Sequence, residues 1–278
     1  MHLHPVDPAA VPALADAEAA PPDDAPHGDA LARSSAARLE RLAALHARLI
    51  ADGSRALLVV LQARDAGGKD GTVRHVCSAL NPAACRVTAF GVPAGEEARH
   101  DYLWRAHAAC PPRGAVGIFN RSQYEDVLAA RVRGLVPEAV WSRRYRHLCE
   151  FERMLADEGT AVVKLFLHVS RAEQARRLRA RLDDPARHYK YDPGDLDDRA
   201  RWDDYTRAYR AVLRKTSAER APWYVVPADD KKVRNYLVAG ALVRTLEAMA
   251  PEPRVLPPGR LAALRAELEA RLAAEGNA

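Results

Sequence analysis

One short loop, residues 65–72, combines the residue types that bind phosphate groups. Its sequence, D-A-G-G-K-D-G-T, places Lys69 directly after Gly67 and Gly68, and it follows an apolar run at residues 57–61. Glycines let several backbone N–H groups point at one phosphate, and a lysine adds a full positive charge. A buried strand that leads into such a loop, with a helix after it, is typical of a P-loop. The pattern therefore predicts that the chain binds phosphoryl groups.

The loop departs from the common P-loop pattern G-x-x-x-x-G-K-[ST] at two positions. Ala63 stands where the first glycine is expected, and Asp70 stands where a serine or threonine usually meets the magnesium ion. A carboxylate beside phosphates is favourable chiefly when cations neutralise it, so Asp65 and Asp70 indicate magnesium binding or substrate positioning. The alternative is a tight strand-to-helix turn with a solvated lysine. The apolar strand before the loop favours the phosphate site.

A second polar cluster follows the apolar run at residues 114–119. It consists of Asn120, Arg121, Glu125 and Asp126. Ligands of open α/β sheets bind at the carboxyl ends of the strands, and a planar guanidinium suits phosphate oxygens. Arg121 is therefore expected to clamp a phosphate. The alternative is a polar helix cap in which Glu125 completes a capping box.

Basic residues dominate a third segment. Arginines occupy positions 176, 177, 179 and 181, and residues 174–182 contain no acid. Arg177 and Arg181 are four residues apart and project from one face of a helix, and Lys190 follows shortly after it. Such a helix above a phosphate loop predicts a lid that closes over phosphates and excludes water. The alternative is a solvated charged helix, although such helices usually mix both signs.

The charge of the chain is unevenly distributed. Residues 1–32 contain six acidic residues and no Lys or Arg, whereas the rest of the chain carries 42 Lys and Arg and 31 acidic residues, a net charge of +11. Such a surplus suits a polyanionic partner: a nucleotide, polyphosphate or nucleic acid. The four cysteines lack the spacing of a metal site or a disulfide framework, which favours a reducing, cytoplasmic environment. Neither a membrane span nor a secretory signal is predicted.

Short apolar runs alternate with helical patterns along the chain. Strands are predicted at residues 56–62, 86–90, 114–119, 161–169 and 223–226. Helices are predicted at residues 34–51, 71–80, 96–107, 124–130, 137–158, 171–182, 196–216, 231–249 and 258–275. This alternation predicts βαβ units, and thus an α/β fold with a parallel sheet flanked by helices. We expect residues 33–278 to form one domain and residues 1–32 to be a flexible acidic extension rich in alanine and proline.

The last predicted helix carries a stripe of leucines. Leu261, Leu264, Leu268 and Leu272 recur at helical spacing. Such a stripe is typical of a surface that is covered by protein. It predicts packing against the domain or a contact in a dimer, and a homo-oligomer is expected.

Five blocks of sequence, taken together, resemble the polyphosphate kinase 2 family. They are D-A-G-G-K-D-G-T (65–72), F-N-R-S-Q-Y-E-D-V-L (119–128), R-x-x-x-R-x-D-D-P (177–185), H-Y-K-Y-D-P-G-D-L (188–196) and A-P-W-Y-V-V-P-A-D-D-K-K (221–232). The resemblance implies a thymidylate-kinase-like P-loop kinase fold with a helical lid at about residues 177–205. It also implies magnesium-dependent transfer of a terminal phosphoryl group between inorganic polyphosphate and nucleoside mono- or diphosphates.

By position, the resemblance implies a role for each candidate residue. Asp65 would bind Mg²⁺ and, with Asn120, organise it against the acceptor phosphate. Lys69, Arg121, Arg177 and Arg181 would hold phosphates and stabilise the charge of the transferring group. The expected catalytic residues are Asp65, Lys69, Asn120, Arg121 and Arg177. The expected substrate contacts are Gly67, Gly68, Asp70, Gly71, Thr72, Glu125, Arg181 and Lys190.

The pair Asn120 and Glu125 departs from the pattern of many family members, which have Asp and Asn at these positions. It resembles the subgroup that phosphorylates AMP as well as ADP. Adenine or guanine nucleotides are therefore the expected acceptors.

Two other functions stay open at this point. The first is an ATP-dependent nucleoside monophosphate kinase of the same fold, for which G-K-[ST] would be the more usual loop. The second is a nucleic-acid-binding module, which would need exposed aromatic side chains interleaved with basic ones. The four tryptophans lie within predicted helices and a strand, so no nucleic-acid partner is expected.

Overall fold

The centre of the molecule is a five-stranded parallel sheet. The structure is a computed structural model, and it describes residues 1–275. The strand order is β2-β3-β1-β4-β5, and every pairing is parallel. The strands are β1 (Ala56–Ala63), β2 (Cys85–Ala89), β3 (Val116–Asn120), β4 (Thr160–His168) and β5 (Trp223–Pro227). The predicted α/β fold with a parallel sheet is confirmed.

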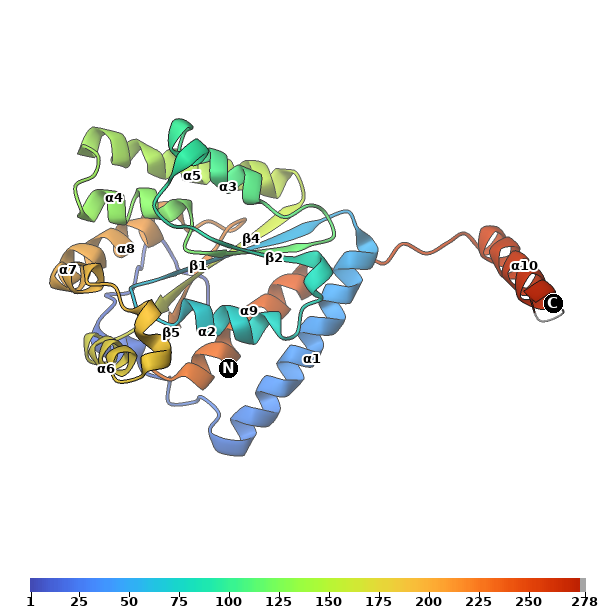
Figure 1. Ribbon diagram of the computed structural model, residues 1–278, viewed down its shortest axis with the longest axis horizontal. Helices are drawn as coiled ribbons and strands as arrows, with labels where there is room; N and C mark the ends of the chain where they lie inside the picture. The colour runs from blue at the N-terminus through green and yellow to red at the C-terminus, as the bar shows by residue number, and fades with distance from the viewer. Residues whose placement is uncertain (276–278) are drawn as a thin grey trace.

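Helices cover both faces of this sheet, because alternate side chains of each strand point to opposite sides. Leu57, Val59 and Leu61 of β1 pack into one core, and Leu58 and Val60 pack into the other. Figure 1 shows the two helical layers. One consists of α1 (Gly28–Asp52), α2 (Lys69–Cys77) and α9 (Lys231–Met249), and the other consists of α3 (Trp104–Ala109), α4 (Ala129–Val132), α5 (Glu138–Asp157) and α8 (Trp202–Thr216).

A lid lies beyond the carboxyl edge of the sheet. It is formed by α6 (Arg171–Leu182), the 3-10 helix η5 (Pro185–Lys190) and α7 (Gly194–Ala200). α6 begins where β4 ends, because Ser170 caps it by accepting a hydrogen bond from the backbone of Glu173. The lid therefore stands beside the loop that follows β1, which is where a phosphate site was predicted.

Three predicted helices are divided in the structure. The helix predicted at residues 96–107 is the 3-10 helix η3 (Gly95–Arg99) followed by α3, and the one at 124–130 is η4 (Gln123–Asp126) followed by α4. The helix predicted at 196–216 breaks at Arg201 into α7 and α8. The apolar spacing alone does not mark such breaks. A further 3-10 turn, η2 (Pro82–Ala84), precedes β2.

The N-terminal segment corrects one prediction. Residues 1–27 lie along the domain, with the 3-10 helix η1 (Asp16–Ala19) beside β5. Val6 and Leu14 are buried in the core that also contains α8. The backbone N–H of Val6 donates to Trp223 O, and that of Asp229 donates to Ala19 O. The prediction of a flexible extension was wrong, because a few widely spaced apolar residues anchor a segment whose composition is that of a linker.

The C-terminal helix α10 (Pro258–Glu275) stands away from the domain at the end of a proline-rich linker (Figure 1). None of its residues is buried against any other part of the described chain. The structure therefore does not show the packing against the domain that the leucine stripe predicted as one of two arrangements. Among residues 1–275, no helix is long and apolar enough to cross a membrane.

Candidate active site

The loop between β1 and α2 has an unusual backbone conformation. Ala66 and Gly68 both have left-handed backbone angles, with φ of 58° and 101°. Gly68 favours glycine because side chains rarely adopt this φ, and a Cβ atom there would also displace the guanidinium of Arg234. Alternating right- and left-handed residues form a concave nest for anions, and α2 begins at the next residue, Lys69. Gly67, Gly68 and Lys69 therefore lie between a strand and a helix, as predicted, and their contact with phosphate stays a prediction.

Lys69 lies beneath this loop. Its side chain is nearly buried, and Nζ donates a hydrogen bond to Ala63 O at 2.9 Å. Burial lowers the pKa of the Lys69 ammonium and Arg121 lowers it further, whereas Asp65 and Glu125 oppose this effect. Four charged groups of the site act on Lys69, with Asp70 as the fourth, so Lys69 belongs to one electrostatic cluster with them.

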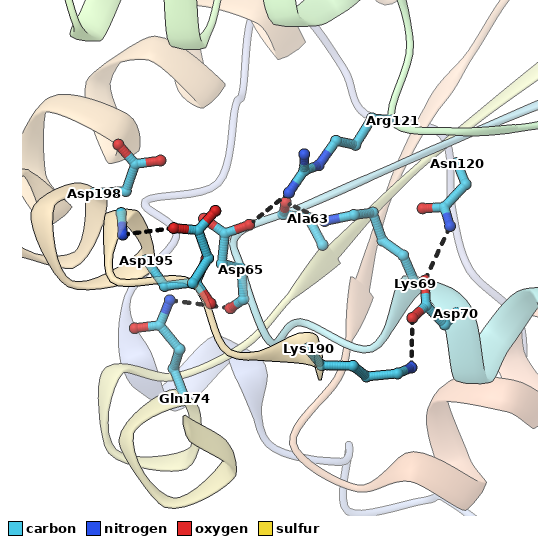
Figure 2. Close-up of polar contacts among 12 residues, drawn as sticks. Ala63, Asp65, Lys69, Asp70, Asn120, Arg121, Gln174, Lys190, Asp195 and Asp198 are labelled. Carbon is cyan, nitrogen blue, oxygen red and sulfur yellow. Dashed lines mark hydrogen bonds and ion pairs between the residues drawn. The ribbon is translucent and has the colours of Figure 1, made fainter. Parts of the chain in front are cut away.

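Asp65 and Arg121 face each other across the ends of β1 and β3. Arg121 Nη2 donates to Asp65 Oδ1 at 2.9 Å (Figure 2). Arg121 itself has φ of 61°, a conformation that non-glycine residues rarely adopt. Glu125 lies beneath this pair, and burial raises its pKa. The structure therefore brings together the acidic and basic side chains predicted at the two strand ends.

Asp70 connects the loop to the second strand end and to the lid. Asn120 Nδ2 donates to Asp70 Oδ1 at 3.0 Å, and Lys190 Nζ donates to Asp70 Oδ2 at 2.7 Å (Figure 2). The hydrogen bond from Lys190 is the main cause that lowers the pKa of Asp70. One lid lysine therefore contacts one loop carboxylate.

The two arginines predicted to reach down from the lid have different surroundings. Arg181 binds Asp195 and Lys190 O within the lid. Arg177 is nearly buried and donates to Ala66 O of the loop at 3.1 Å, as well as to the carbonyls of residues 228 and 229. In this structure Arg177 therefore supports the loop from one side. Its predicted contact with phosphate stays a prediction, although its side chain also lines the cleft described below.

Two residues of the site carried no recognisable signal in the sequence. Gln174 is almost fully buried on α6, and its Nε2 donates to Asp65 O at 3.0 Å (Figure 2). Its Oε1 accepts from Arg199 of α7 at 2.8 Å, so the amide joins lid and loop. Arg234 on α9 lies against Gly68, and burial followed by the charge of Arg177 lowers its pKa to about 10. A lone glutamine in an arginine-rich helix and an arginine far along the chain become recognisable only in three dimensions.

Two hollows meet at this site. A large cleft of about 1190 Å³ runs between loop and lid, lined by ten basic and five acidic side chains. A smaller cavity of about 260 Å³ lies on the other side of Asp65 and is lined by four basic and six acidic side chains, with Phe90 and Tyr209 among its aromatic walls. Both hollows share the residues Asp65, Phe90, Gly91, Arg121, Asp192 and Asp195. The site therefore has a basic compartment and a more acidic one, joined at Asp65 and Arg121.

The donor atoms near the loop fit a magnesium ion that is shared with substrate phosphates. Mg²⁺ is usually held by one or two carboxylates, with phosphate oxygens and waters completing the shell. Asp65 and Asp70 supply such carboxylates at the cleft wall. Among residues 1–275, no cluster of three or more His, Cys, Asp or Glu side chains could hold a metal alone. The residues therefore suit an ion that arrives with the substrate.

Known proteins with similar sequences and structures belong to one family. Residues 28–254 match the model of the family described as Polyphosphate kinase 2. The chain is 54% identical over 227 residues to an AMP/ADP-polyphosphate phosphotransferase of Meiothermus ruber, covering 78% of this chain and 85% of that protein. It is 43% identical over 224 residues to an ADP-polyphosphate phosphotransferase of Rhodopseudomonas palustris, covering 76% and 78%. The crystal structure of Polyphosphate Kinase 2 from Arthrobacter aurescens superposes with a TM-score of 0.83 at 40% identity, covering 96% of this chain and 99% of that one.

Proposed function

The chain belongs to the polyphosphate kinase 2 family, and from this premise we propose that it phosphorylates both AMP and ADP in a magnesium-dependent reaction. It is an enzyme that transfers phosphoryl groups between inorganic polyphosphate and nucleotides. This membership decides against the ATP-dependent monophosphate kinase as the main function. The nucleotide substrates also support the predicted cytoplasmic location.

The observation that carries the proposal is the junction of the two hollows at Asp65 and Arg121. Polyphosphate carries a negative charge on every unit, so the large basic cleft suits it and the more acidic cavity does not. Direct transfer requires the donor's terminal phosphorus and the acceptor oxygen to meet at one point. The shared residues lie where the two substrates would touch.

The smaller cavity has walls that suit a nucleoside. Tyr205 and Trp202 line its inner side, while Val92 and Leu135 are exposed large apolar residues that also line it. Aromatic and apolar side chains favour the faces of a nucleobase, and ligand sites combine such walls with a few polar groups. Arg133 holds both oxygens of Asp198 in this lining, and their remaining lone pairs can accept hydrogen bonds from hydroxyl and amino groups. We therefore place the acceptor nucleoside here, with its phosphate toward Arg121.

The reaction requires the protein mainly to position the two substrates and to stabilise their negative charge. An oxygen of the acceptor phosphate attacks the terminal phosphorus of polyphosphate, a new P–O bond forms, and the bridging P–O bond breaks with the shortened chain as leaving group. The attacking oxygen is already ionised, so no general base is needed. Lys69 and Arg121 stabilise the negative charge of the transferring group, as in other phosphoryl-transfer sites. Bound Mg²⁺, held by Asp65 and Asp70, would neutralise further phosphate charge.

The acceptor range follows from one local feature and one comparison. Asn120 and Glu125 stand where many family members have Asp and Asn, which resembles the subgroup that uses AMP as well as ADP. The relative from Meiothermus ruber, 54% identical, carries the name of an AMP/ADP enzyme. Both observations support AMP as a second acceptor.

The test is turnover by the purified protein with polyphosphate and Mg²⁺, offering AMP and ADP separately and resolving AMP, ADP and ATP by chromatography. We expect product from both acceptors and loss of product when a chelator removes Mg²⁺. Product from ADP alone would reject the AMP proposal, and full activity in chelator would reject the magnesium proposal. As a control, Lys69→Ala should stay folded and lose activity.

A further inference from the structure

The lid is joined to the rest of the domain at two junctions. It begins after β4, at residues 169–171, and it ends at Arg201, where α7 meets α8. The two junctions lie side by side, because Arg199 Nη1 donates a hydrogen bond to Arg171 O at 2.8 Å. A group that holds both junctions therefore fixes the orientation of the lid toward the loop.

The N-terminal segment contacts the first junction with two groups. Asp16 Oδ1 accepts a hydrogen bond at 3.0 Å from the backbone N–H of Arg171, the first residue of α6. Ala15 O accepts a hydrogen bond at 2.8 Å from Nε2 of His168, the last residue of β4. The dipole of α6 also favours a carboxylate at this end of the helix. Figure 1 shows the blue N-terminal segment beside the start of α6.

The other end of η1 is attached to the segment that follows β5. The backbone N–H of Asp229 donates to Ala19 O at 3.1 Å, and Ala19 is fully buried. Asp229 Oδ1 in turn accepts a hydrogen bond at 2.8 Å from the backbone N–H of Ser170, the residue before α6. Hydrogen bonds thus link η1, the segment after β5 and the start of the lid in a closed ring, which holds Asp16 in place.

The charge of Asp16 also acts on the second junction. Arg64 lies there: its Nη1 donates to Trp202 O at 3.1 Å, and its Cζ is 3.9 Å from the centre of the Trp202 ring. Burial lowers the pKa of Arg64 to about 10, and the charges of Tyr209 and Asp16 oppose this effect. Burial also lowers the pKa of Arg199, and Asp16 again opposes it. One carboxylate of the N-terminal segment therefore lies near both ends of the lid.

We propose that Asp16 is a positioning residue that fixes the orientation of the lid during phosphoryl transfer. The lid contributes Arg181, Arg187 and Lys190 to the wall of the basic cleft, and the residues that line this cleft do not include Asp16. Without the contact from Asp16 the lid adopts more orientations, so a smaller fraction of molecules is competent to bind polyphosphate and the apparent affinity falls in proportion. The proposal rests on the assignment of the basic cleft to polyphosphate.

The experiment compares two variants of the full-length protein that keep the size of the side chain. Asp16→Leu removes the acceptor, whereas Asp16→Asn keeps an oxygen that can accept from Arg171 N. We expect Asp16→Leu to raise the KM for polyphosphate about fivefold and to change kcat less than about twofold, as for the loss of one hydrogen bond. Asp16→Asn should restore the KM of the wild type. Asp23→Leu is the matched control, because Asp23 is an exposed acid of the same segment that makes none of these contacts.

A second readout follows the lid directly and uses no substrate. Tyr189 of the lid is 80% exposed, and chymotrypsin cleaves after tyrosine, so mass spectrometry of the fragments reports cleavage at this residue. Asp16→Leu should be cleaved there about fivefold faster than the wild type, because the cleavage rate follows the population of loosened lid. The melting temperature should stay close to that of the wild type, since Asp16 is exposed.

The two readouts separate the lid contact from the assignment of the cleft. An unchanged cleavage rate in Asp16→Leu would overturn the proposal, and so would an Asp16→Asn variant that is impaired as strongly as Asp16→Leu. Faster cleavage with an unchanged KM for polyphosphate would instead reject the basic cleft as the polyphosphate site, on which the proposal rests.

Discussion

Arg177 offers a test of how the phosphate loop keeps its shape. Its guanidinium donates to Ala66 O in the loop, to two carbonyls after β5, and to Glu173 at 2.7 Å. Replacing Arg177 by methionine keeps the aliphatic length and removes all these donors. Hydrogen bonds from charged groups contribute about 1.5–3 kcal/mol each, and breaking a buried ion pair costs about 3–5 kcal/mol. We therefore expect Arg177→Met to lower the free energy of unfolding by about 3–5 kcal/mol, which corresponds to a fall in melting temperature of about 10 °C.

The assay is urea and thermal unfolding of the protein without polyphosphate, so that only the loop's internal support is measured. Arg181→Met is the matched control, because Arg181 lies one turn further along α6 and binds only Asp195 and Lys190 O. Its loss should be about 1 kcal/mol. If Arg177→Met were as stable as the wild type or more stable, Arg177 would be a repelled cation awaiting phosphate rather than a support of the loop, and this reasoning would be refuted.

Three further predictions concern the lid, the junction and the N-terminal segment. Gln174→Met removes the hydrogen bond to Asp65 O. We therefore expect kcat to fall about fivefold and the Mg²⁺ concentration that gives the half-maximal rate to rise. Steady-state rates measure both, and an unchanged Mg²⁺ dependence would contradict this role of Gln174. Burial and the charge of Asp65 raise the pKa of Asp195 to about 6 from an ordinary 3.8. The folded state therefore binds the proton more tightly, and the free energy of unfolding contributed by Asp195 falls by up to about 3 kcal/mol as pH rises through this range. Urea unfolding at both ends of the range should show the difference in wild type and not in Asp195→Asn; an equal pH dependence in both proteins would contradict the assignment. Deleting residues 1–27 removes buried Val6 and Leu14 and should lower the free energy of unfolding by about 3–6 kcal/mol in urea, whereas an unchanged value would support a free extension.

The sheet was predictable because its central strands β1, β3 and β4 are buried on both faces. Runs such as residues 57–61 and 161–169 are almost wholly apolar, and short runs of this kind between turn residues are typical of central parallel strands. The N-terminal segment was not predictable, because its contacts depend on single residues, such as Val6 beside Trp223, that are separated by polar stretches. The breaks that divide three predicted helices were not predicted either, because the apolar spacing alone does not mark them.

At the site, the sequence predicted which charged residues come together and missed some of what each one contacts. Asp65, Lys69 and Arg121 lie side by side because neighbouring strands end at one edge of the sheet. Arg177 was predicted as a lid residue over the phosphates, and its carbonyl partners come from segments distant in the sequence. The spacing of residues along a helix predicts the face on which a side chain lies. It does not predict which neighbouring group that side chain contacts.

In the proposed reaction, polyphosphate and nucleotide occupy the two hollows that join at Asp65 and Arg121. Arg187 lines only the basic cleft, and the exposed Leu135 lines only the smaller cavity, so each can be changed with little effect on folding. The most direct measurement is the KM for polyphosphate and for ADP in Arg187→Ala and Leu135→Ala. We predict that Arg187→Ala raises the KM for polyphosphate about fivefold and leaves that for ADP unchanged, and that Leu135→Ala does the reverse, as expected for the loss of about 1 kcal/mol of binding each. Variants that shift the same KM, or that shift the opposite one, would contradict this claim.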